Sequence, residues 1–325
     1  MVVSIETEAD SHNGVRFVHR LQYWALRAVL TVAARMGPDR LAWCGAALMQ
    51  RIGPRLRQNR RALTNLAIAF PDKSDRERQQ IARQMWANMG RTFAETLVLD
   101  QLVNDPSRIE IPDLDQLSGR AAADKPVIGC TLHLGNWEIA ILPLKLLGRR
   151  PTGVYKPLDN PLIDRWLAQT RLMLYPGGLL GKGDRDEAQA GQRTARKLID
   201  RARSGSALGF VCDHFDRRGE CVPFMGRTAR FTTAPAMIAR HVGAQIWLGR
   251  AVRIGTSSRF RLDVVHFDAP KTADKRGDAQ ALTTAIFATF EKWIRENPEQ
   301  WMWWNTRWVD PSTAPEQDAA TSNSD

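Results

Sequence analysis

Residues 131–140, TLHLGNWEIA, predict a buried strand that ends at His133 and a helix that begins at Trp137. Gly135 and Asn136 form the tight turn between them, and Asn136 suits the N-cap position of the helix. A buried strand that turns directly into a helix is typical of an α/β sheet, where ligands bind outside the carboxyl ends of the strands. The stretch therefore predicts both a fold class and the edge of the sheet that carries a site.

The surrounding chain, from about residue 125 to residue 297, alternates strands and helices in the same way. Apolar runs predict strands at 127–132, 153–156, 207–212, 245–252 and 260–267. Helical periodicity predicts helices at 137–147, 162–174, 189–204, 234–242 and 279–297. These segments predict an α/β domain over residues 116–310.

The part of the chain before this domain shows helical periodicity over residues 15–104. Gly37 and Pro38 break the pattern, and Ser74 with Glu77 has the spacing of a capping box. The apolar run 21–34 is 14 residues long and contains Arg27, so it is too short to span a bilayer comfortably and could lie in a membrane interface or in a core. We expect residues 1–115 to form a helical, membrane-associating region and the polar residues 311–325 to form a disordered tail.

The composition indicates a globular protein with an anionic partner. Hydrophobic residues make up 43% and charged residues 25%, which excludes a disordered chain, and the four cysteines include no C-x-x-C pair. Lys and Arg number 46 against 35 Asp and Glu, a net charge of +11. This excess predicts nucleic acid, a phosphate-bearing substrate or a membrane surface as the partner, and eleven Trp against three Tyr favour the membrane.

His133 and Glu138 are the residues of the corner that can do chemistry. Glu138 lies in the first helical turn, where the helix dipole favours its ionised form. The spacing allows Glu138 to accept a hydrogen bond from one ring nitrogen of His133, which leaves the other nitrogen as a base facing the pocket. The alternative is that His133 is merely satisfied at a strand end and that Glu138 only caps a helix.

No enzyme nucleophile accompanies this pair. The G-x-S-x-G motif is absent, and Ser204 and Ser206 lie in a turn between a predicted helix and a predicted strand. Cys130 lies three residues before His133, so alternation along the strand directs the two side chains to opposite faces. The pattern therefore favours a base that activates a substrate hydroxyl directly, without an acyl-enzyme.

Several blocks of the sequence together resemble one family. HLGNWE, residues 133–138, resembles the H-x-x-x-x-(D/E) signature of the lysophospholipid acyltransferase superfamily, and in particular the H-F-G-N-W-E form of the lipid A biosynthesis lauroyl and myristoyl acyltransferases, with Leu134 in place of Phe. Matching blocks follow the family order at 65–71, 155–164, 219–226 and 298–308. In the last block, Asn305 stands where the family usually has His, so a role for that His does not carry over.

The resemblance implies a glycerolipid-acyltransferase-like fold with a mixed central sheet flanked by helices. It also implies transfer of a fatty acyl chain to a hydroxyl of a lipid A precursor. The co-substrate would be an acyl thioester on acyl carrier protein (acyl-ACP) or on coenzyme A (acyl-CoA), with no other cofactor. His133 would be the general base and Glu138 would orient it, at the cytoplasmic face of the inner membrane, where the protein is peripheral or has one N-terminal anchor.

The substrate-binding candidates are Asn136 in the turn, Arg171, Lys182 and Asp213. The resemblance gives the region of Arg171 a role towards substrate phosphate or the oxyanion, and it places Asp213 in a second acidic block. Lys182, in a Gly-rich loop, would contact an anionic headgroup. The alternatives are a solvated helix face for Arg171, an exposed turn for Asp213 and a solvent-facing loop for Lys182.

Other functions have weaker sequence support. Five potential zinc ligands lie within ten residues, but their spacing fits no finger or ribbon: Cys212, Asp213, His214, Asp216 and Cys221. The arginines at 51–61 are not accompanied by a nucleic-acid-binding motif, so they favour an anionic membrane surface. WMWW at 301–304 suits that surface or core packing. The remaining alternatives are an acyltransferase for another glycolipid or phospholipid and a non-enzymatic basic membrane-binding protein.

Overall fold

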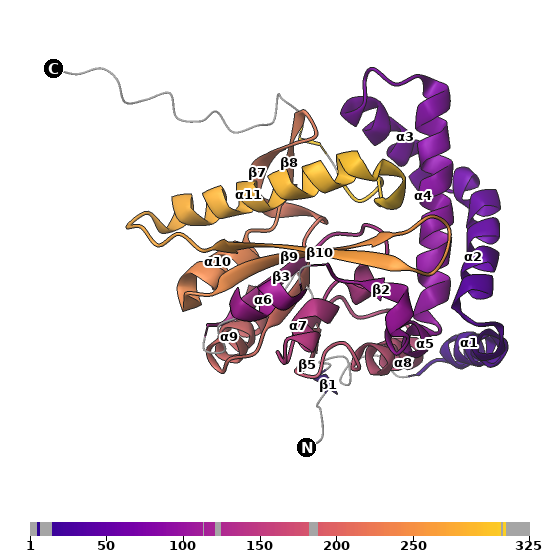
Figure 1. The fold of residues 1–325 in the computed structure, drawn as a ribbon, viewed down its shortest axis with the longest axis horizontal. Helices are drawn as coiled ribbons and strands as arrows, with labels where there is room; N and C mark the ends of the chain where they lie inside the picture. Colours follow the sequence, from indigo (N-terminus) through magenta and orange to yellow (C-terminus); the bar gives the residue numbers. More distant parts are fainter. Residues whose placement is uncertain are drawn as a thin grey trace.

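The computed structural model describes residues 5–6, 15–112, 114–120, 125–181, 188–306 and 308–309. These residues form a central sheet with helices on both faces, and a group of N-terminal helices stands at one end of it (Figure 1). The predicted α/β class, with a mixed sheet and an N-terminal helical region, is confirmed. Lys182 and the predicted tail 311–325 lie outside the described residues.

The central sheet has the strand order β1-β5-β4-β6-β3-β9-β10-β2. Its members are β1 (Ile5–Glu6), β2 (Ile109–Glu110), β3 (Val127–Thr131), β4 (Thr152–Tyr155), β5 (Gly178–Gly181), β6 (Leu208–Val211), β9 (Gln245–Arg253) and β10 (Phe260–Asp268). β3 is central, buried along its whole length, and parallel to both β6 and β9. β10 runs antiparallel to β9, which makes the sheet mixed.

Two apolar cores cover the two faces of this sheet. One contains residues of α9 (Ala188–Arg203), α10 (Ala234–Val242) and α11 (Lys275–Glu296), together with the hairpin β7 (Phe215–Phe224) and β8 (Arg227–Phe231). The other contains residues of α5 (Leu99–Val103), α6 (Leu114–Arg120) and α7 (Leu142–Leu146). Figure 1 shows α11 on one side of the sheet and α7 on the other. The carboxyl ends of β3 and β6 lie side by side at one edge of the sheet.

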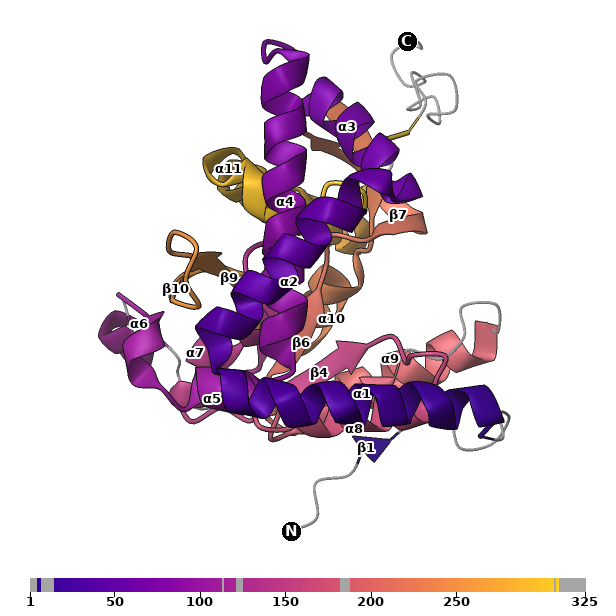
Figure 2. The same cartoon turned by 90° about the vertical axis from the view of Figure 1, so that its right-hand side faces the viewer.

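The N-terminal helices are α1 (Phe17–Met36), α2 (Pro38–Ile52), α3 (Arg57–Ala69) and α4 (Asp75–Thr96). Gly37 has a φ of 75°, so the chain turns between α1 and α2 as predicted. Ser74 and Glu77 form the predicted capping box of α4. α2 and α4 lie side by side, and α1 crosses below them (Figure 2).

The contact between α2 and α4 is made through backbone. A Cβ built on Gly45 would lie 2.2 Å from the carbonyl oxygen of Gly90, and the reverse contact is 2.1 Å. Only glycine permits this approach, so α2 and α4 are held at a fixed distance.

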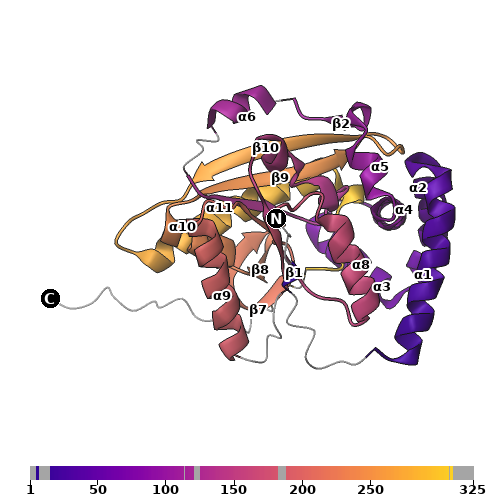
Figure 3. The same ribbon diagram turned by 90° about the horizontal axis from the view of Figure 1, so that it is seen from below.

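α1 lies beside α8 (Pro161–Arg171), as Figure 3 shows from below. Asn160, the N-cap of α8, donates from Nδ2 to the carbonyl oxygen of His19, 3.1 Å away. The same atom lies 2.8 Å from Oε1 of Gln22. The first helix is thereby attached to the α/β part of the molecule.

The structure differs from the sequence prediction at the helix expected over 137–147. The chain forms a 3-10 turn, η4 (Trp137–Ile139), and then the separate helix α7. Pro143 lies in the first turn of α7 and has no N–H to bond back to Ile139, so one continuous helix cannot form.

The structure decides between the two alternatives predicted for residues 301–304, which are a membrane surface and core packing. Trp301 and Trp303 are 0% exposed, and Met302 is buried with Met89 and Trp137. The membrane-surface prediction for WMWW is therefore wrong. These side chains pack in the core because the chain passes directly behind the corner that follows β3, where Trp301 pairs with Leu134.

Candidate active site

The side chains of His133 and Asp213 meet at the carboxyl edge of the sheet. Each lies two residues beyond its strand, His133 after β3 and Asp213 after β6, and the two strands are parallel neighbours. Nδ1 of His133 is 2.7 Å from Oδ1 of Asp213. The backbone N–H of His133 donates to Oδ2 of the same carboxylate, 2.9 Å away.

Asp213 is buried but strongly acidic. Its side chain is 1% exposed, and the indole N–H of Trp301 donates to Oδ2 at 2.8 Å. Burial alone would raise the pKa of Asp213, but the charge and hydrogen bonds of His133 and the charge of His214 lower it to about 2. The carboxylate is therefore ionised near neutral pH and favours the His133 tautomer with a proton on Nδ1.

The ring of His133 is packed from two sides. Its centroid lies 5.0 Å from that of Trp137 and 4.6 Å from that of His214, both edge to face. The side chain is 12% exposed. With Nδ1 directed at Asp213, Nε2 is the nitrogen available to act as a base. Nδ2 of Asn305 also lies 3.2 Å from Nδ1.

The carboxylate of Glu138 binds Arg171, and not His133 as the sequence predicts. Nε of Arg171 is 2.7 Å from Oε2, and Nη2 is 2.5 Å from Oε1, so the guanidinium and the carboxylate form a bidentate pair. Burial lowers the pKa of Arg171, but the charge and hydrogen bonds of Glu138 more than offset this and raise it. The pair is mostly buried, with side-chain exposures of 20% for Arg171 and 7% for Glu138.

The predicted hydrogen bond from His133 to Glu138 is therefore wrong. Glu138 lies in the 3-10 turn η4, which directs its carboxylate to the end of α8. Asp213 reaches His133 because parallel neighbouring strands end level with each other. Asp213 and Arg171 were both predicted as substrate-binding residues, and the structure brings each of them to one member of the predicted catalytic pair.

Asn136 is enclosed by protein. It is 0% exposed, its Oδ1 accepts from the backbone N–H of Glu138 at 3.2 Å, and its Nδ2 donates to Glu95 at 2.9 Å. The capping role is as predicted, although the element that it caps is η4. The expected substrate contact is not available to this side chain, because none of its surface is exposed.

An apolar pocket lies beside this site, between the central strands and the segment 140–144. Its lining includes Gly129, Gly209 and Gly249 from three adjacent strands, with Ile141 and Leu144 opposite them. A Cβ on Gly129 would lie 3.0–3.1 Å from Leu144 and Ile141. The side chains opposite therefore already pack against the glycine backbone, and the cavity between them is small, about 20 Å³.

The N-terminal helices expose an unusual number of apolar side chains. On α1 they recur at helical spacing along one face: Phe17, Val18, Leu21, Trp24, Val29 and Val32. On α2 and after it the exposed residues are Trp43, Leu48, Ile52 and Leu56. The predicted basic cluster is exposed beside them: Arg51, Arg55, Arg57, Arg60 and Arg61. Among the described residues, no helix is both long and apolar enough to cross a membrane.

An exposed aromatic residue links the helical region to the site. Phe93 of α4 is 51% exposed, and its ring centroid lies 6.3 Å from that of Trp137. Trp137 in turn packs on His133. Apolar side chains therefore lead from the surface of α4 to the corner that carries His133.

Known proteins resemble this chain over most of its length. Residues 11–310 match the family model described as bacterial lipid A biosynthesis acyltransferase. The chain is 24% identical over 251 residues to the lipid A biosynthesis palmitoleoyltransferase of Escherichia coli (strain K12), covering 76% of this chain and 77% of the relative. It is 25% identical to the lipid A biosynthesis lauroyltransferase of the same organism, over 75% of this chain and 76% of the relative. A lipid A biosynthesis acyltransferase of Shigella flexneri matches at 24%.

Proposed function

Because the chain belongs to the bacterial lipid A biosynthesis acyltransferases, we propose that it transfers a fatty acyl chain from an acyl thioester to a hydroxyl group of a lipid A precursor. The observation that carries the mechanism is the 2.7 Å contact between Nδ1 of His133 and Asp213. It prepares Nε2 to take the proton from the acceptor hydroxyl. The ionised carboxylate then stabilises the imidazolium that forms, and a base in this position contributes about 10²–10⁴-fold.

We assign Arg171 to the negative charge that develops on the thioester carbonyl oxygen. A guanidinium has five N–H donors, and Glu138 accepts from only two of its nitrogens. Glu138 holds the planar group in one orientation, so little reorganisation is needed when the charge appears. The thiolate is a good leaving group, so the hydroxyl attacks the thioester directly and no acyl-enzyme forms.

The apolar cavity beside Ile141 and Leu144 has a volume of about 20 Å³, which is room for about one water molecule, so we do not assign the hydrocarbon chain of the donor to it. The donor is an acyl carrier protein or a CoA thioester, and either would present its carbonyl carbon near the corner.

We also propose that the protein works at the cytoplasmic face of the inner membrane. The exposed face of α1 offers apolar burial, and the arginines at the far end of α2 and in α3 offer attraction to anionic lipid. Phe93 is exposed on α4 and packs on Trp137, which packs on His133, and these rings would give a lipid acceptor an apolar path to the base.

The test is an assay of the purified protein with a lipid A precursor and either acyl-ACP or acyl-CoA. We expect one acyl group to be added, and His133→Ala to lose nearly all turnover while its circular dichroism stays that of the wild type. Asp213→Asn should lose about 10³–10⁴-fold in kcat, because the amide no longer stabilises the imidazolium. Wild-type turnover by folded His133→Ala, or a stoichiometric acyl adduct on the protein in the absence of acceptor, would contradict the mechanism.

A further inference from the structure

The turn between His133 and Glu138 is held from the N-terminal helix α4. The carbonyl oxygen of Gly135 accepts from Oγ1 of Thr92 at 2.8 Å and from Nδ2 of Asn88 at 3.1 Å. Thr92 and Asn88 are one turn apart on the same face of α4, and both are buried. The catalytic turn is therefore attached to an element more than forty residues earlier in the chain.

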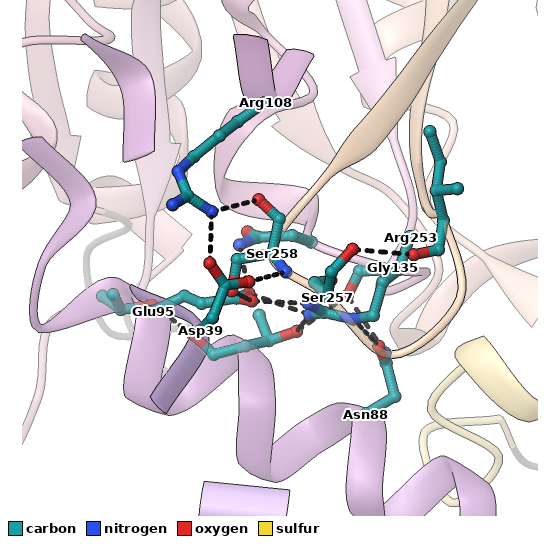
Figure 4. Close-up of polar contacts among 12 residues, drawn as sticks. Asp39, Asn88, Glu95, Arg108, Gly135, Arg253, Ser257 and Ser258 are labelled. Carbon is teal, nitrogen blue, oxygen red and sulfur yellow. Dashed lines mark hydrogen bonds and ion pairs between the residues drawn. The ribbon is translucent and has the colours of Figure 1, made fainter. Parts of the chain in front are cut away.

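A buried ion pair lies directly beneath this turn (Figure 4). Glu95 of α4 and Arg253 of β9 have side-chain exposures of 0% and 2%, and they meet at 2.5 Å and 2.8 Å. Glu95 also accepts from Nδ2 of Asn136 at 2.9 Å and from Oγ of Ser258 at 2.7 Å. One carboxylate therefore binds the catalytic turn, the sheet and the β9–β10 loop.

Arg253, the other member of the ion pair, makes a further contact with α4. Nε of Arg253 donates to Oδ1 of Asn88 at 2.9 Å, which orients the Asn88 amide towards Gly135. The backbone N–H of Gly135 donates to the carbonyl oxygen of Gln300 at 3.0 Å, and that of Asn136 to Ala251 at 3.1 Å. Both residues of the turn are thus fixed by backbone and side-chain contacts.

The turn has no free space to move towards the sheet. Gly135 has a φ of 60°, and a Cβ built on it would lie 1.8 Å from the carbonyl oxygen of Ala251. A buried ion pair is weak evidence for stability, because apolar residues of the same volume often stabilise a fold equally well or better. A positional role explains the charged pair better than a contribution to stability does.

We propose that Thr92 and Glu95 of α4 are positioning residues for acyl transfer, because they fix the Gly135–Asn136 turn and with it the placement of His133 relative to Glu138. His133 lies two residues before the turn, and Glu138 is bonded to the turn through Oδ1 of Asn136. A shift of the turn changes the distance between the base and the Glu138–Arg171 pair. This inference rests on the proposed roles of His133 and Arg171.

Thr92 offers a matched pair of variants. Thr92→Val keeps the shape and the burial but removes the hydroxyl that donates to Gly135, whereas Thr92→Ser keeps the hydroxyl and loses one methyl group. We expect Thr92→Val to lower kcat about tenfold with KM within about twofold of the wild type, because small misplacements of reacting groups are costly in rate. Thr92→Ser should retain kcat within about twofold.

The assay is steady-state kinetics of the full chain, at a temperature at which each variant gives the wild-type circular dichroism. Glu95→Gln is the second variant: it should lower kcat more than Thr92→Val, and its melting temperature is measured alongside because it leaves Arg253 unpaired. An unchanged kcat in Thr92→Val, an effect confined to KM or to melting temperature, or an equal loss in Thr92→Ser overturns the proposal. If His133→Ala retains activity, the proposed function fails instead, so the two failures are distinguishable.

Discussion

Asp213 combines burial with a negative charge, and the residues around it explain why both persist. Trp301 and the backbone of His133 each donate a hydrogen bond to it, and the His133 ring faces it at 2.7 Å. Its pKa in the folded protein is about 2, against an ordinary value of 3.8. The difference between these values couples the protonation of one residue to the stability of the fold.

We expect Asp213 to make stability depend on pH in acid. A carboxyl group whose pKa is lowered by folding stabilises the native state above its ordinary pKa, and this contribution is lost as the pH falls towards the folded value. The wild type should therefore lose on the order of 2 kcal/mol of unfolding free energy through this group between about pH 5 and pH 2. Denaturant unfolding at a series of pH values should show a shallower slope for Asp213→Asn, and an identical slope would contradict the expectation.

A second expectation at this scale concerns the Glu138–Arg171 pair. Glu138→Gln keeps the size of the side chain but removes the charge that holds Arg171, so we expect kcat to fall about 10²-fold with a smaller change in KM. Arg171→Lys keeps the positive charge and loses the bidentate geometry, so it should be impaired as well. Steady-state kinetics measure both variants. A change confined to KM would show that the pair binds substrate in the ground state only.

At the scale of elements, α1 and α2 are notable for the side chains that they leave exposed. The apolar face of α1 includes Phe17 at 83% and Trp24 at 68% exposure, and Trp43 of α2 is 69% exposed. Single exposed apolar residues are ordinary on a protein surface, but a continuous face on one helix marks an interaction site. The arginines at the end of α2 and in α3 lie at the opposite end of α2 from α1 (Figure 2), beside the exposed Leu48, Ile52 and Leu56, and give that end of the helical region its charge.

This surface predicts salt-sensitive binding to anionic vesicles. Each arginine near such a membrane contributes about 1 kcal/mol, and salt screens the attraction. Reversing Arg60 and Arg61 to Glu should therefore release much of the protein in a vesicle co-sedimentation assay. Lys271, in the segment before α11, and Lys275, the first residue of α11, are both exposed and provide a control of equal charge change that should leave binding intact. Equal release by both double variants would mean that net charge alone governs attachment.

Elements defined by local signals were predictable from the sequence. The capping box at Ser74, the break at Gly37 and five of the strands of the α/β part follow from residues within one turn or one run, whereas the short strand β5 was not predicted. The hairpin of β7 and β8 was not predicted, because its turn is Met225–Gly226 and Met225 adopts a φ of 53° that such residues rarely take. The usual Asn-Gly signal is absent there.

The candidate site was predictable only in part. His133, Glu138, Asp213 and Arg171 were all identified as candidates, but their pairing depends on the register of β3 with β6 and on where α8 ends. These are tertiary properties that spacing along the chain does not contain. Glu95 and Arg253 carried no sequence signal, since a charged residue in a helix or a strand ordinarily faces water.

At the scale of the whole molecule, the site is assembled from segments spread over most of the chain. α4 supplies Asn88, Thr92 and Glu95, the strands supply the central residues, and Gln300 and Trp301 close the site from the C-terminal side. Gln300 also donates to the carbonyl oxygen of Arg253 at 3.1 Å and accepts from its N–H at 2.8 Å. Gln300 and Trp301, near the C-terminal end of the described residues, therefore help to hold the Gly135–Asn136 turn and the site beside it.

A truncation series tests this dependence. A chain that stops after residue 296 retains His133, Glu138, Arg171 and Asp213 but lacks Gln300 and Trp301, and we expect no measurable acyl transfer. A chain that stops after residue 310 keeps both of these contacts and should retain kcat within about twofold. Activity assays and circular dichroism of both chains provide the comparison. Full activity in the shorter chain would show that the closing segment is dispensable.

The position of Gln300 and Trp301 also sets the moment at which the enzyme becomes competent during its synthesis. Translation delivers His133 and Asp213 well before residues 300 and 301, so a growing polypeptide carries its base and its carboxylate for some time without the contacts that hold them. A chain interrupted at any earlier codon should therefore occupy a ribosome without consuming acyl thioester.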